Sequence, residues 1–297
     1  MSESADRLGE VRRLVSDYLP GYVISAVEYL GEGMDNTTFE VNGELVVRFA
    51  KDTDHGARDI QVSREAQLLT VVTSVATVPT PEPVFVAPHA GCLAYKKLHG
   101  SAVLDLPSSQ RRVHAVSLAA ELGMFLSSIH GIPIAEVDQF VDLDIAPLNE
   151  YLSEAAEFYG GLKDMFTVAQ QRAVEVFLSA PLPDHVFTAV MCHNDLSIDH
   201  ILVDPSTWRA TAIIDWTDAA ITDPAHDFAL ICRDLGPEAL DAARDSYTSK
   251  ENDGNEMRER AMFVARCKVF EDLHYGMDTE ADSYTDNSMA AMEWLFP

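Results

Sequence analysis

Two segments place acidic and imidazole side chains directly beside short apolar runs. Residues 192–204 read CHNDLSIDHILVD and hold two histidines and three aspartates. Residues 211–229 read TAIIDWTDAAITDPAHDFA, in which Asp215 ends an apolar run that is typical of a strand. If Asp195 and His200 lie at one strand end and Asp215 at another, the three side chains could share one Mg²⁺. A bound metal and a carboxylate that orients an attacking hydroxyl are parts that phosphoryl transfer requires.

The N-terminal part offers groups that could hold phosphates. The stretch LGEGMDNTTFEV contains Gly31 and Gly33, which would let the backbone approach a ligand closely. Arg48, in the strand-like run LVVRF, could pair with Glu65 on the following helix and bind phosphate. Lys51 is an alternative cation, but its odd offset from Arg48 predicts that it faces the other side of the strand. Taken alone, each feature also suits an ordinary hairpin turn or a solvated surface pair.

Apolar periodicity divides the chain into a β-rich beginning and a helical remainder. Residues 22–50 alternate as strands do, and Asn42-Gly43 predicts a type I′ hairpin between two of them. The other predicted elements are helices at 5–18, 58–73 and 109–130, two helices within 148–179, strands VFVAP, CLAYKKL, ILVD and ATAIIDW, and helices over most of 225–295.

A length of 297 residues suits about two domains, and 47% apolar residues suffice for a large core. We therefore predict an α+β fold of two lobes. The β-rich N-terminal lobe comprises residues 1–95, the hinge residues 96–100, and the mainly helical C-terminal lobe residues 101–297.

The formal net charge of −27 argues against nucleic acid as a partner, because its phosphates would be repelled. Two explanations of the charge stay open: a solubilising surface, or an acidic cleft that attracts a polycationic ligand. Residues 131–162 carry seven acidic side chains and residues 269–287 carry six, with no lysine or arginine in either stretch. The chain shows no secretory signal and no membrane-helix pattern, and its four cysteines are widely spaced. We therefore expect a reduced, cytoplasmic protein without a membrane partner.

Together and in this order, the segments resemble a known family. HNDLSIDHILVD and IIDWTDAAITDPAHDFA closely resemble the antibiotic phosphotransferases of the aminoglycoside/macrolide kinase family. GEGMDNTTFEVNGELVVRFAK resembles the nucleotide-binding hairpin of that family, and LAYKKLHGSAV resembles its hinge. The resemblance spans about residues 25–275. It implies a bilobal fold like that of the eukaryotic protein kinases, and Mg²⁺-dependent transfer of the γ-phosphoryl group of ATP or GTP to a small-molecule hydroxyl.

The resemblance also implies roles for the matching positions. Asp195 corresponds to the catalytic aspartate that orients and deprotonates the acceptor hydroxyl, and Asp215 to the aspartate that binds Mg²⁺. His200 stands where protein kinases carry Asn, and a neutral imidazole can ligate Mg²⁺ there, less well at low pH. Arg48 stands where protein kinases carry Lys and could hold phosphate bidentately. The remaining assignments are nucleotide binding by Gly31, Gly33, Arg48, Glu65, Tyr95 and Leu98, and support of the catalytic loop by His193, Asp223 and Asp227.

Three classes of acceptor are open. An aminoglycoside carries several amines and needs carboxylates, a macrolide carries one amine on a large apolar ring, and a housekeeping substrate such as choline, homoserine or a sugar derivative needs a smaller pocket. We expect an aminoglycoside, which suits the acidity best, and a monomeric enzyme, as the resemblance implies. The candidate acceptor-binding residues are Ser197, Asp218, Asp234 and Glu238 one turn apart on one helix face, and Glu271 with Asp272. Apart from Ser197, each could equally belong to a solvated surface.

Two other classes of function fit part of the sequence. A nucleotide-binding pseudoenzyme would use the N-terminal lobe, but the intact Asp195 and Asp215 argue against it. A metal-dependent hydrolase could use His193, Asp195 and His200. The sequence offers no second ligand cluster of recognisable spacing for such a hydrolase, and the N-terminal hairpin would be unexplained.

Overall fold

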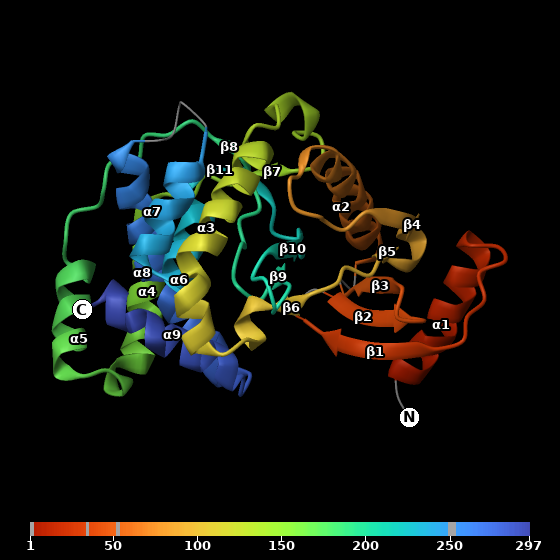
Figure 1. Ribbon diagram of the computed structural model, residues 1–297, viewed down its shortest axis with the longest axis horizontal. Helices are drawn as coiled ribbons and strands as arrows, with labels where there is room; N and C mark the ends of the chain where they lie inside the picture. The colour runs from red at the N-terminus through yellow and green to blue at the C-terminus, as the bar shows by residue number, and fades with distance from the viewer. Residues whose placement is uncertain (1–2, 34–35, 52–53, 249–253) are drawn as a thin grey trace. The chain divides into compact units, whose positions relative to one another are not determined.

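A computed structural model describes residues 3–33, 36–51, 54–248 and 254–297. The chain forms two compact units, one made of residues 1–74 and 79–99 and the other of residues 75–78 and 100–297. The main division, between His99 and Gly100, falls inside the segment that the sequence assigns to the hinge. A sheet dominates the first unit and helices dominate the second, so the predicted α+β class is confirmed (Figure 1).

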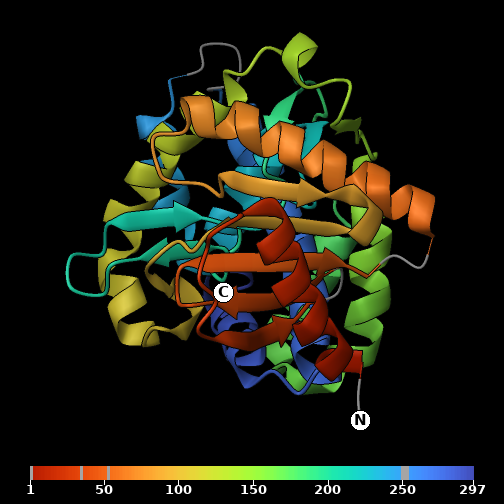
Figure 2. The same ribbon diagram turned by 90° about the vertical axis from the view of Figure 1, so that its right-hand side faces the viewer.

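A five-stranded antiparallel sheet forms the centre of the N-terminal unit. Its order is β1-β2-β3-β5-β4, with β1 at Val27–Glu32, β2 at Asn36–Val41, β3 at Leu45–Ala50, β4 at Pro83–Ala87 and β5 at Cys92–Lys96. Figure 2 shows helix α1 (Glu3–Tyr18) lying across this sheet. The predicted turn is confirmed, because Asn42 and Gly43 have φ angles of 56° and 75° and Glu44 N–H donates to the Val41 carbonyl at 3.0 Å.

Alternation along β3 separates the apolar core from a polar face. Val47 and Phe49 join the buried cluster that Leu14 of α1 completes. Arg48 lies between them and, because successive side chains of a strand point to opposite faces, it points away from this cluster. It meets Glu65 of α2 (His55–Val75) instead. One strand thus supplies both the core and a candidate ligand-binding cation.

Helices make up most of the C-terminal unit. They are α3 (Ser108–His130), α4 (Leu148–Leu162), α5 (Val168–Leu178), α6 (Ala225–Leu235), α7 (Pro237–Ser246), α8 (Asn255–Asp278) and α9 (Asp282–Leu295), joined by short 3-10 turns at Val103–Asp105, Ile134–Glu136 and Lys163–Met165. Helix α3 packs on α7, and α6 packs on α8, which packs in turn on α9. By length and composition α3 could also cross a membrane, but half of its apolar stretch is buried inside the protein. Its packing on α7 accounts for that apolar character.

Two three-stranded sheets carry the two chemistry-bearing segments. Their orders are β10-β9-β6 and β7-β11-β8, with β6 at Ser101–Ala102, β7 at Asp142–Leu143, β8 at Val190–Cys192, β9 at Ile201–Val203, β10 at Ala210–Ile213 and β11 at Ala220–Thr222. The loop of residues 193–200 connects β8 to β9, and β10 ends just before Asp215. The apolar runs ILVD and ATAIIDW predict β9 and β10, whereas β6, β7, β8 and β11, of two or three residues each, are not predicted.

The packing of α3 on α7 makes a prediction about Gly123. A Cβ atom at this position would lie 2.0 Å from the Ala243 carbonyl oxygen of α7, which is backbone and cannot rotate away. Gly123→Ala should therefore lower the free energy of unfolding by about 1–3 kcal/mol. Urea denaturation measures the change. Gly160→Ala in α4 is the matched control, because a Cβ there meets nothing within 4 Å. It should leave stability unchanged or raise it by up to about 1 kcal/mol; equal destabilisation by both variants would contradict the packing argument.

Candidate active site

A fully buried carboxylate anchors the 193–200 loop. Asp227 of α6 accepts hydrogen bonds from the backbone N–H groups of His193, at 3.0 Å, and Asn194, at 2.7 Å. His130, at the end of α3, contacts the same carboxylate through Nε2 at 2.9 Å. Burial raises the pKa of Asp227, but its hydrogen bonds to His130 and Asn194 hold the pKa below its usual value. Asp227 is therefore charged at neutral pH and fixes the start of the loop.

His193 ties the loop to the segment that carries Asp215. Its buried ring packs on Trp216, with ring centroids 4.6 Å apart. Nε2 donates to the Ile214 carbonyl at 3.0 Å, which leaves Nδ1 to accept the Asp195 N–H at 3.3 Å. Burial lowers the pKa of His193, in keeping with a neutral ring. Because both nitrogens are engaged, His193 is not available as a metal ligand, and the hydrolase hypothesis loses one of its three ligands.

The structure brings Asp195, His200 and Asp215 together. His200 Nδ1 lies 2.9 Å from the Asp195 carbonyl oxygen and 3.3 Å from Asp195 Oδ2. His200 Nε2 lies 3.9 Å from Asp215 Oδ2 and 3.4 Å from Asp199 Oδ2. The side chains of Asp195 and Asp215 are 37% and 40% exposed, and that of His200 is 17% exposed. The two carboxylates are thus open to a ligand, while the imidazole between them is largely enclosed.

The donor groups of this cluster fit a divalent cation. When Nδ1–H of His200 donates to the Asp195 carbonyl, the lone pair of Nε2 faces Asp215, so both groups could bind one ion. Mg²⁺ prefers oxygen ligands, and Asp199 and Asp215 supply carboxylates beside the imidazole. Burial lowers the pKa of His200, but the charges of Asp199, Asp195 and Asp215 raise it to about 9. The cluster therefore has enough negative charge to stabilise one added positive charge.

Asp215 has a backbone conformation that is uncommon for a residue with a side chain. Its φ angle is 59°, in the left-handed region, which costs energy for residues other than glycine. Thr217 Oγ1 donates to Asp215 Oδ1 at 2.8 Å and so helps to fix the carboxylate. A strained residue with an exposed, oriented carboxylate is typical of a ligand-binding position.

One face of α9 holds the loop from a second side. Tyr284 and the residues three and four positions after it each donate a hydrogen bond to a carboxylate: Tyr284 to Asp199 at 2.6 Å, Asn287 to Asp234 at 3.0 Å, and Ser288 to Asp272 at 2.7 Å. We call these three residues the α9 clamp. Asp199 lies in the loop itself, and Asp234 accepts the backbone N–H of Ile198 at 3.2 Å. The loop is therefore held by α6 at its start and by the α9 clamp near its end.

Asp234 and Glu238 do not lie on one face of one helix, as the sequence analysis expects. Gly236, with a φ angle of 95°, and Pro237 end α6 and begin α7 between them. Asp234 is buried, and Arg233 binds both of its carboxylate oxygens, at 2.7 and 2.9 Å. It therefore supports the loop instead of contacting an acceptor. Glu238 is exposed in the first turn of α7.

The other predicted acceptor-binding residues divide by exposure. Ser197 is buried, and its hydroxyl donates to Asp199 inside the loop, so its surroundings are internal. Asp272 is engaged by Arg233 and by the α9 clamp. Asp218 and Glu271 are exposed, and Glu271 forms a 2.7 Å ion pair with a lysine one turn earlier in α8.

Asp223 supports α6 as predicted. Its Oδ1 accepts the N–H of Ala225, the first residue of the helix, at 3.0 Å. Arg260 of α8 binds both carboxylate oxygens, at 2.5 and 3.1 Å, and both side chains are buried. Such two-point pairing fixes direction as well as distance. The helix that carries Asp227 is thereby fastened to α8.

Two cations of the N-terminal unit lie near β3. Arg48 Nη1 contacts Glu65 Oε1 at 3.0 Å, so the predicted pair forms, and both side chains are at most 10% exposed. Lys51 Nζ donates to the Gly33 carbonyl at 2.6 Å and pairs with Glu32 at 2.5 Å. Lys51 thus faces away from the Arg48 pair, as expected, and is the cation beside the glycine turn.

The remaining nucleotide-binding candidates are buried or half-buried in the N-terminal unit. Gly31 lies at an irregularity in the pairing of β1 with β2, and residues 34–35 of the glycine turn lie outside the described residues. Tyr95 is buried within β5, so its side chain belongs to the interior of the sheet. Leu98 follows β5 and is half-buried.

Sequence reasoning missed several residues that hold the site. Asp199 lies within CHNDLSIDHILVD, directly before His200, and this position is the sequence signal that could have identified it as part of the site. His130, Arg260 and the α9 clamp lie far from the loop in sequence, and no spacing rule connects them to it. Only the packing of α3, α8 and α9 brings them there.

Comparison with known proteins gives the same fold. A model of the phosphotransferase enzyme family matches residues 26–263. The aminoglycoside 3′-phosphotransferase of Streptomyces fradiae is 26% identical over 156 residues, which are 49% of this chain and 54% of that protein, so the match spans about half of this relative. The GDP complex of aminoglycoside 2′-phosphotransferase-IIIa has a TM-score of 0.69 at 21% identity, covering 96% of this chain and 97% of that one. Macrolide 2′-phosphotransferase type I has a TM-score of 0.65 at 18% identity, covering 98% of both chains. The fold implied by the sequence resemblance is thus confirmed.

The carboxylates around His200 make a prediction about pH. Without added divalent cation, NMR titration should give His200 a pKa of about 9, above the value near 6.5 of an unfolded chain. A raised pKa contributes stability that is complete below about pH 6.5 and lost as the pH rises through about 9. Asp199→Asn should lower the pKa of His200, because it removes the charge that raises the pKa most. Asp204→Asn, in the same segment, should leave it unchanged; an unchanged pKa in Asp199→Asn would contradict the electrostatic explanation.

Proposed function

The chain belongs to the phosphotransferase enzyme family, and from this premise we propose that it transfers the γ-phosphoryl group of ATP or GTP to a hydroxyl group of a cationic small molecule. The expected acceptor is an aminoglycoside. The observation that carries the proposal is the cluster of Asp195, His200 and Asp215. Its two exposed carboxylates could divide the work of phosphoryl transfer, one acting on the acceptor and one on the metal.

Asp195 would act on the acceptor. Its carboxylate orients the acceptor hydroxyl and takes its proton as the new oxygen–phosphorus bond forms. The bond between the γ-phosphorus and the oxygen of the nucleoside diphosphate then breaks. His193 and Asp227 hold the backbone before Asp195 and take no part in the chemistry, since their polar atoms are engaged inside the protein.

We propose His200 and Asp215 as ligands of Mg²⁺. An ion held by these two residues would supply positive charge that offsets the charge of the transferred phosphoryl group. Tyr284 holds the Asp199 carboxylate beside the same Nε2, so Asp199 would add negative charge next to the ion. The Asp195 carbonyl oxygen, at Nδ1, would orient the imidazole from behind. A histidine must be neutral to bind a metal, so binding would weaken as the pH falls.

For the nucleotide we propose the N-terminal unit. Arg48, oriented by Glu65, could bind phosphate with its planar guanidinium fork. Lys51 lies beside the Gly33 carbonyl, where the glycine turn would let a phosphate approach the backbone. For Gly31, Tyr95 and Leu98, a role in nucleotide binding is proposed from the family resemblance alone.

A group of exposed carboxylates supports a cationic acceptor. Tyr151 of α4 packs edge-on against His226, and His226 Nδ1 contacts Asn194 Oδ1 at 3.0 Å, directly before Asp195. Burial raises the pKa of the Tyr151 phenol, and four carboxylates raise it further: Asp144, Glu154, Glu271 and Glu150. We call these four residues the acidic wall. All four are exposed, and a field of one sign attracts a ligand that carries several ammonium groups.

One observation favours a macrolide as the second candidate acceptor. Leu143 and Ile145, on either side of Asp144, are 66% and 49% exposed. The apolar ring of a macrolide could pack on these two side chains while its one amine pairs with a single carboxylate. A small housekeeping substrate would leave most of the acidic wall without a role.

The compartment and the oligomeric state are also proposals. The four cysteines, Cys92, Cys192, Cys232 and Cys267, are buried free thiols, and burial raises the pKa of each. Such thiols suit a reducing compartment, so we propose that the enzyme acts in the cytoplasm. Following the family resemblance, we propose that it acts as a monomer.

Asp195→Ala should abolish most of the transfer activity. Loss of the general base should lower kcat by about 10²- to 10⁴-fold, while binding of the Mg-nucleotide stays intact. A radiolabelled transfer assay with aminoglycosides, macrolides and amino alcohols, using ATP and GTP, measures this and identifies the acceptor. Asp245→Ala, an exposed change on α7, is the control. Full activity in Asp195→Ala would refute the catalytic assignment. If the native protein bound Mg-nucleotide but transferred phosphate to no acceptor, the pseudoenzyme hypothesis would replace this proposal.

The acidic wall should act on KM more than on kcat. Glu150→Gln combined with Glu154→Gln should raise KM for an aminoglycoside about 3- to 30-fold, because exposed ion pairs each contribute up to about 1 kcal/mol. Added salt should shrink the difference. Glu157→Gln, on the same helix but outside the wall, is the matched control. A KM that is unchanged in the double variant, or independent of salt, would count against a cationic acceptor at this place.

A further inference from the structure

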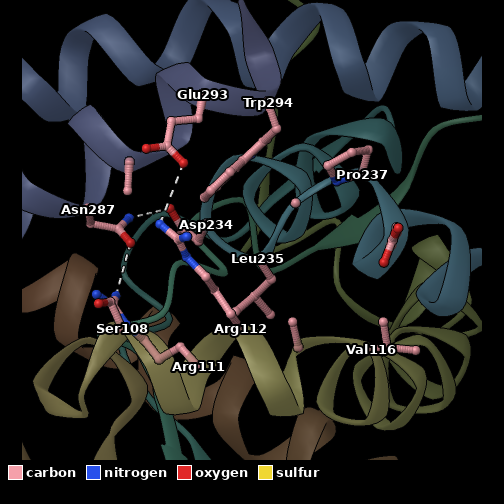
Figure 3. A pocket seen from close by; sticks show the side chains of 14 residues that line it. Ser108, Arg111, Arg112, Val116, Asp234, Leu235, Pro237, Asn287, Glu293 and Trp294 are labelled. Carbon is pink, nitrogen blue, oxygen red and sulfur yellow. Dashed lines mark hydrogen bonds and ion pairs between the residues drawn. The ribbon is translucent and has the colours of Figure 1, made fainter. Parts of the chain in front are cut away.

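A cavity of about 340 Å³ lies in the C-terminal unit between the beginning of α3, the junction of α6 with α7, and α9 (Figure 3). Its volume lies in the range of pockets that bind small molecules. The acidic wall and the cluster around His200 do not line it. It is therefore distinct from the cluster of Asp195, His200 and Asp215, although Asp234 and Asn287, which support the 193–200 loop, line it.

The polar feature of this cavity is Arg111, in the first turn of α3. It is half-buried, and its Nη1 donates to Asn287 Oδ1, a neutral acceptor, at 2.9 Å. Burial lowers the pKa of Arg111, since the enclosure disfavours its charge. Within the described ranges, no carboxylate lies within 4 Å of its guanidinium. The charge of Asp234, which lies farther away, acts against the effect of burial on this pKa. A partly enclosed cation whose hydrogen-bond partner is neutral is suited to binding an anion.

The other charged groups around the cavity are already matched or lie at its edge. Arg112 pairs with Glu293 at 3.6 Å, and the carboxylate of Asp234 is bound by Arg233. Glu238 is exposed. Arg111 is therefore the lining cation whose hydrogen-bond partner is neutral, and a single carboxylate matches it better than a doubly charged phosphate.

The rest of the lining is largely apolar. In Figure 3, Arg111 and Asn287 lie on one side of the cavity and Pro237 on the other, with Leu235 and Trp294 between them. The Trp294 indole is fixed, because its Nε1 donates to the Cys232 carbonyl at 3.1 Å. A fixed aromatic ring and aliphatic neighbours favour a ligand with an apolar body.

We propose that this cavity binds a small organic monocarboxylate, with its carboxylate on Arg111 and its apolar body against Leu235 and Trp294. The planar guanidinium can present two parallel N–H donors to a carboxylate. The Asn287 Oδ1 now occupies one of those donors, so the ligand competes with the amide for Arg111.

That competition reaches the 193–200 loop. Asn287 belongs to the α9 clamp, and its Nδ2 donates to Asp234, which accepts the N–H of Ile198 at 3.2 Å. A carboxylate that draws Arg111 away from Asn287 therefore changes the support of the loop. We therefore expect ligand binding in the cavity to change the chemical shift of the Ile198 amide.

The test is a titration of the full-length protein with benzoate, followed by NMR at the Trp294 indole N–H and the Ile198 amide. We expect saturable shifts at both, in the millimolar range that a ligand of this size reaches. Benzylamine and benzyl alcohol, of the same size but cationic and neutral, should bind at least about tenfold more weakly. The experiment needs neither nucleotide nor acceptor, so its outcome is independent of the transfer assay.

Two variants and a control sharpen this test. Arg111→Met should weaken benzoate binding about tenfold or more, and Ala290→Leu should block it by filling the cavity without touching a charge. Arg172→Met, which removes an exposed arginine of α5, should change the dissociation constant less than twofold. The proposal is overturned if benzoate gives no saturable shift at Trp294, if Arg111→Met or Ala290→Leu binds it normally, or if benzylamine binds as tightly. Binding that leaves the Ile198 amide unmoved would overturn the link to the loop.

Discussion

The buried carboxylate of Asp227 is the contact on which the position of the 193–200 loop depends. It gathers two backbone N–H groups of the loop and one imidazole nitrogen of His130, all in the interior. Without this acceptor those donors would be buried unsatisfied, at about 1–3 kcal/mol for each group. Asp227 lies on α6, whose beginning is fastened to α8 by the pair of Asp223 and Arg260. The position of Asp195 thus follows from a chain of buried charges that starts in the helical core.

Burial divides the aspartates of this region into two kinds. Asp223, Asp227 and Asp234 are enclosed, and each is matched by an arginine or by several N–H donors. The side chains of Asp195 and Asp215 are exposed by more than a third. A buried carboxylate remains charged only if hydrogen-bond donors or cations surround it. The enclosed aspartates therefore have a structural role. The exposed ones lie where a substrate or a metal could reach them.

Local patterns in the sequence are sufficient for the longer elements and for the core of the site, but not for the short strands β6, β7, β8 and β11. The turn at Asn42-Gly43 requires positive φ angles, which asparagine and glycine adopt readily, so this dipeptide is enough to predict the turn. The motif around Asp195, His200 and Asp215 could be read because its members lie at the ends of β8, β9 and β10. The partners that hold the motif could not be read, since Tyr284 and Arg260 reach it only through the packing of helices. Glycine followed by proline is a sequence signal for the end of one helix and the start of the next. Gly236-Pro237 therefore already indicates that Asp234 and Glu238 lie on different helices.

His200 shows why an imidazole can stand at this position and what it requires. The Asp195 carbonyl takes Nδ1–H, so the ring presents Nε2 towards Asp215 without help from a distant residue. An asparagine at the same place would be neutral at every pH, whereas an imidazole among three carboxylates gains a proton readily. The charge that makes the place attractive to a cation therefore also makes it attractive to a proton. Asp199 lies at the centre of this balance, and Tyr284 keeps its carboxylate beside Nε2 by a 2.6 Å hydrogen bond. A metal that binds here must displace that proton. Through Tyr284 and Asp199, α9 therefore influences the relative affinity of the site for a metal and for a proton.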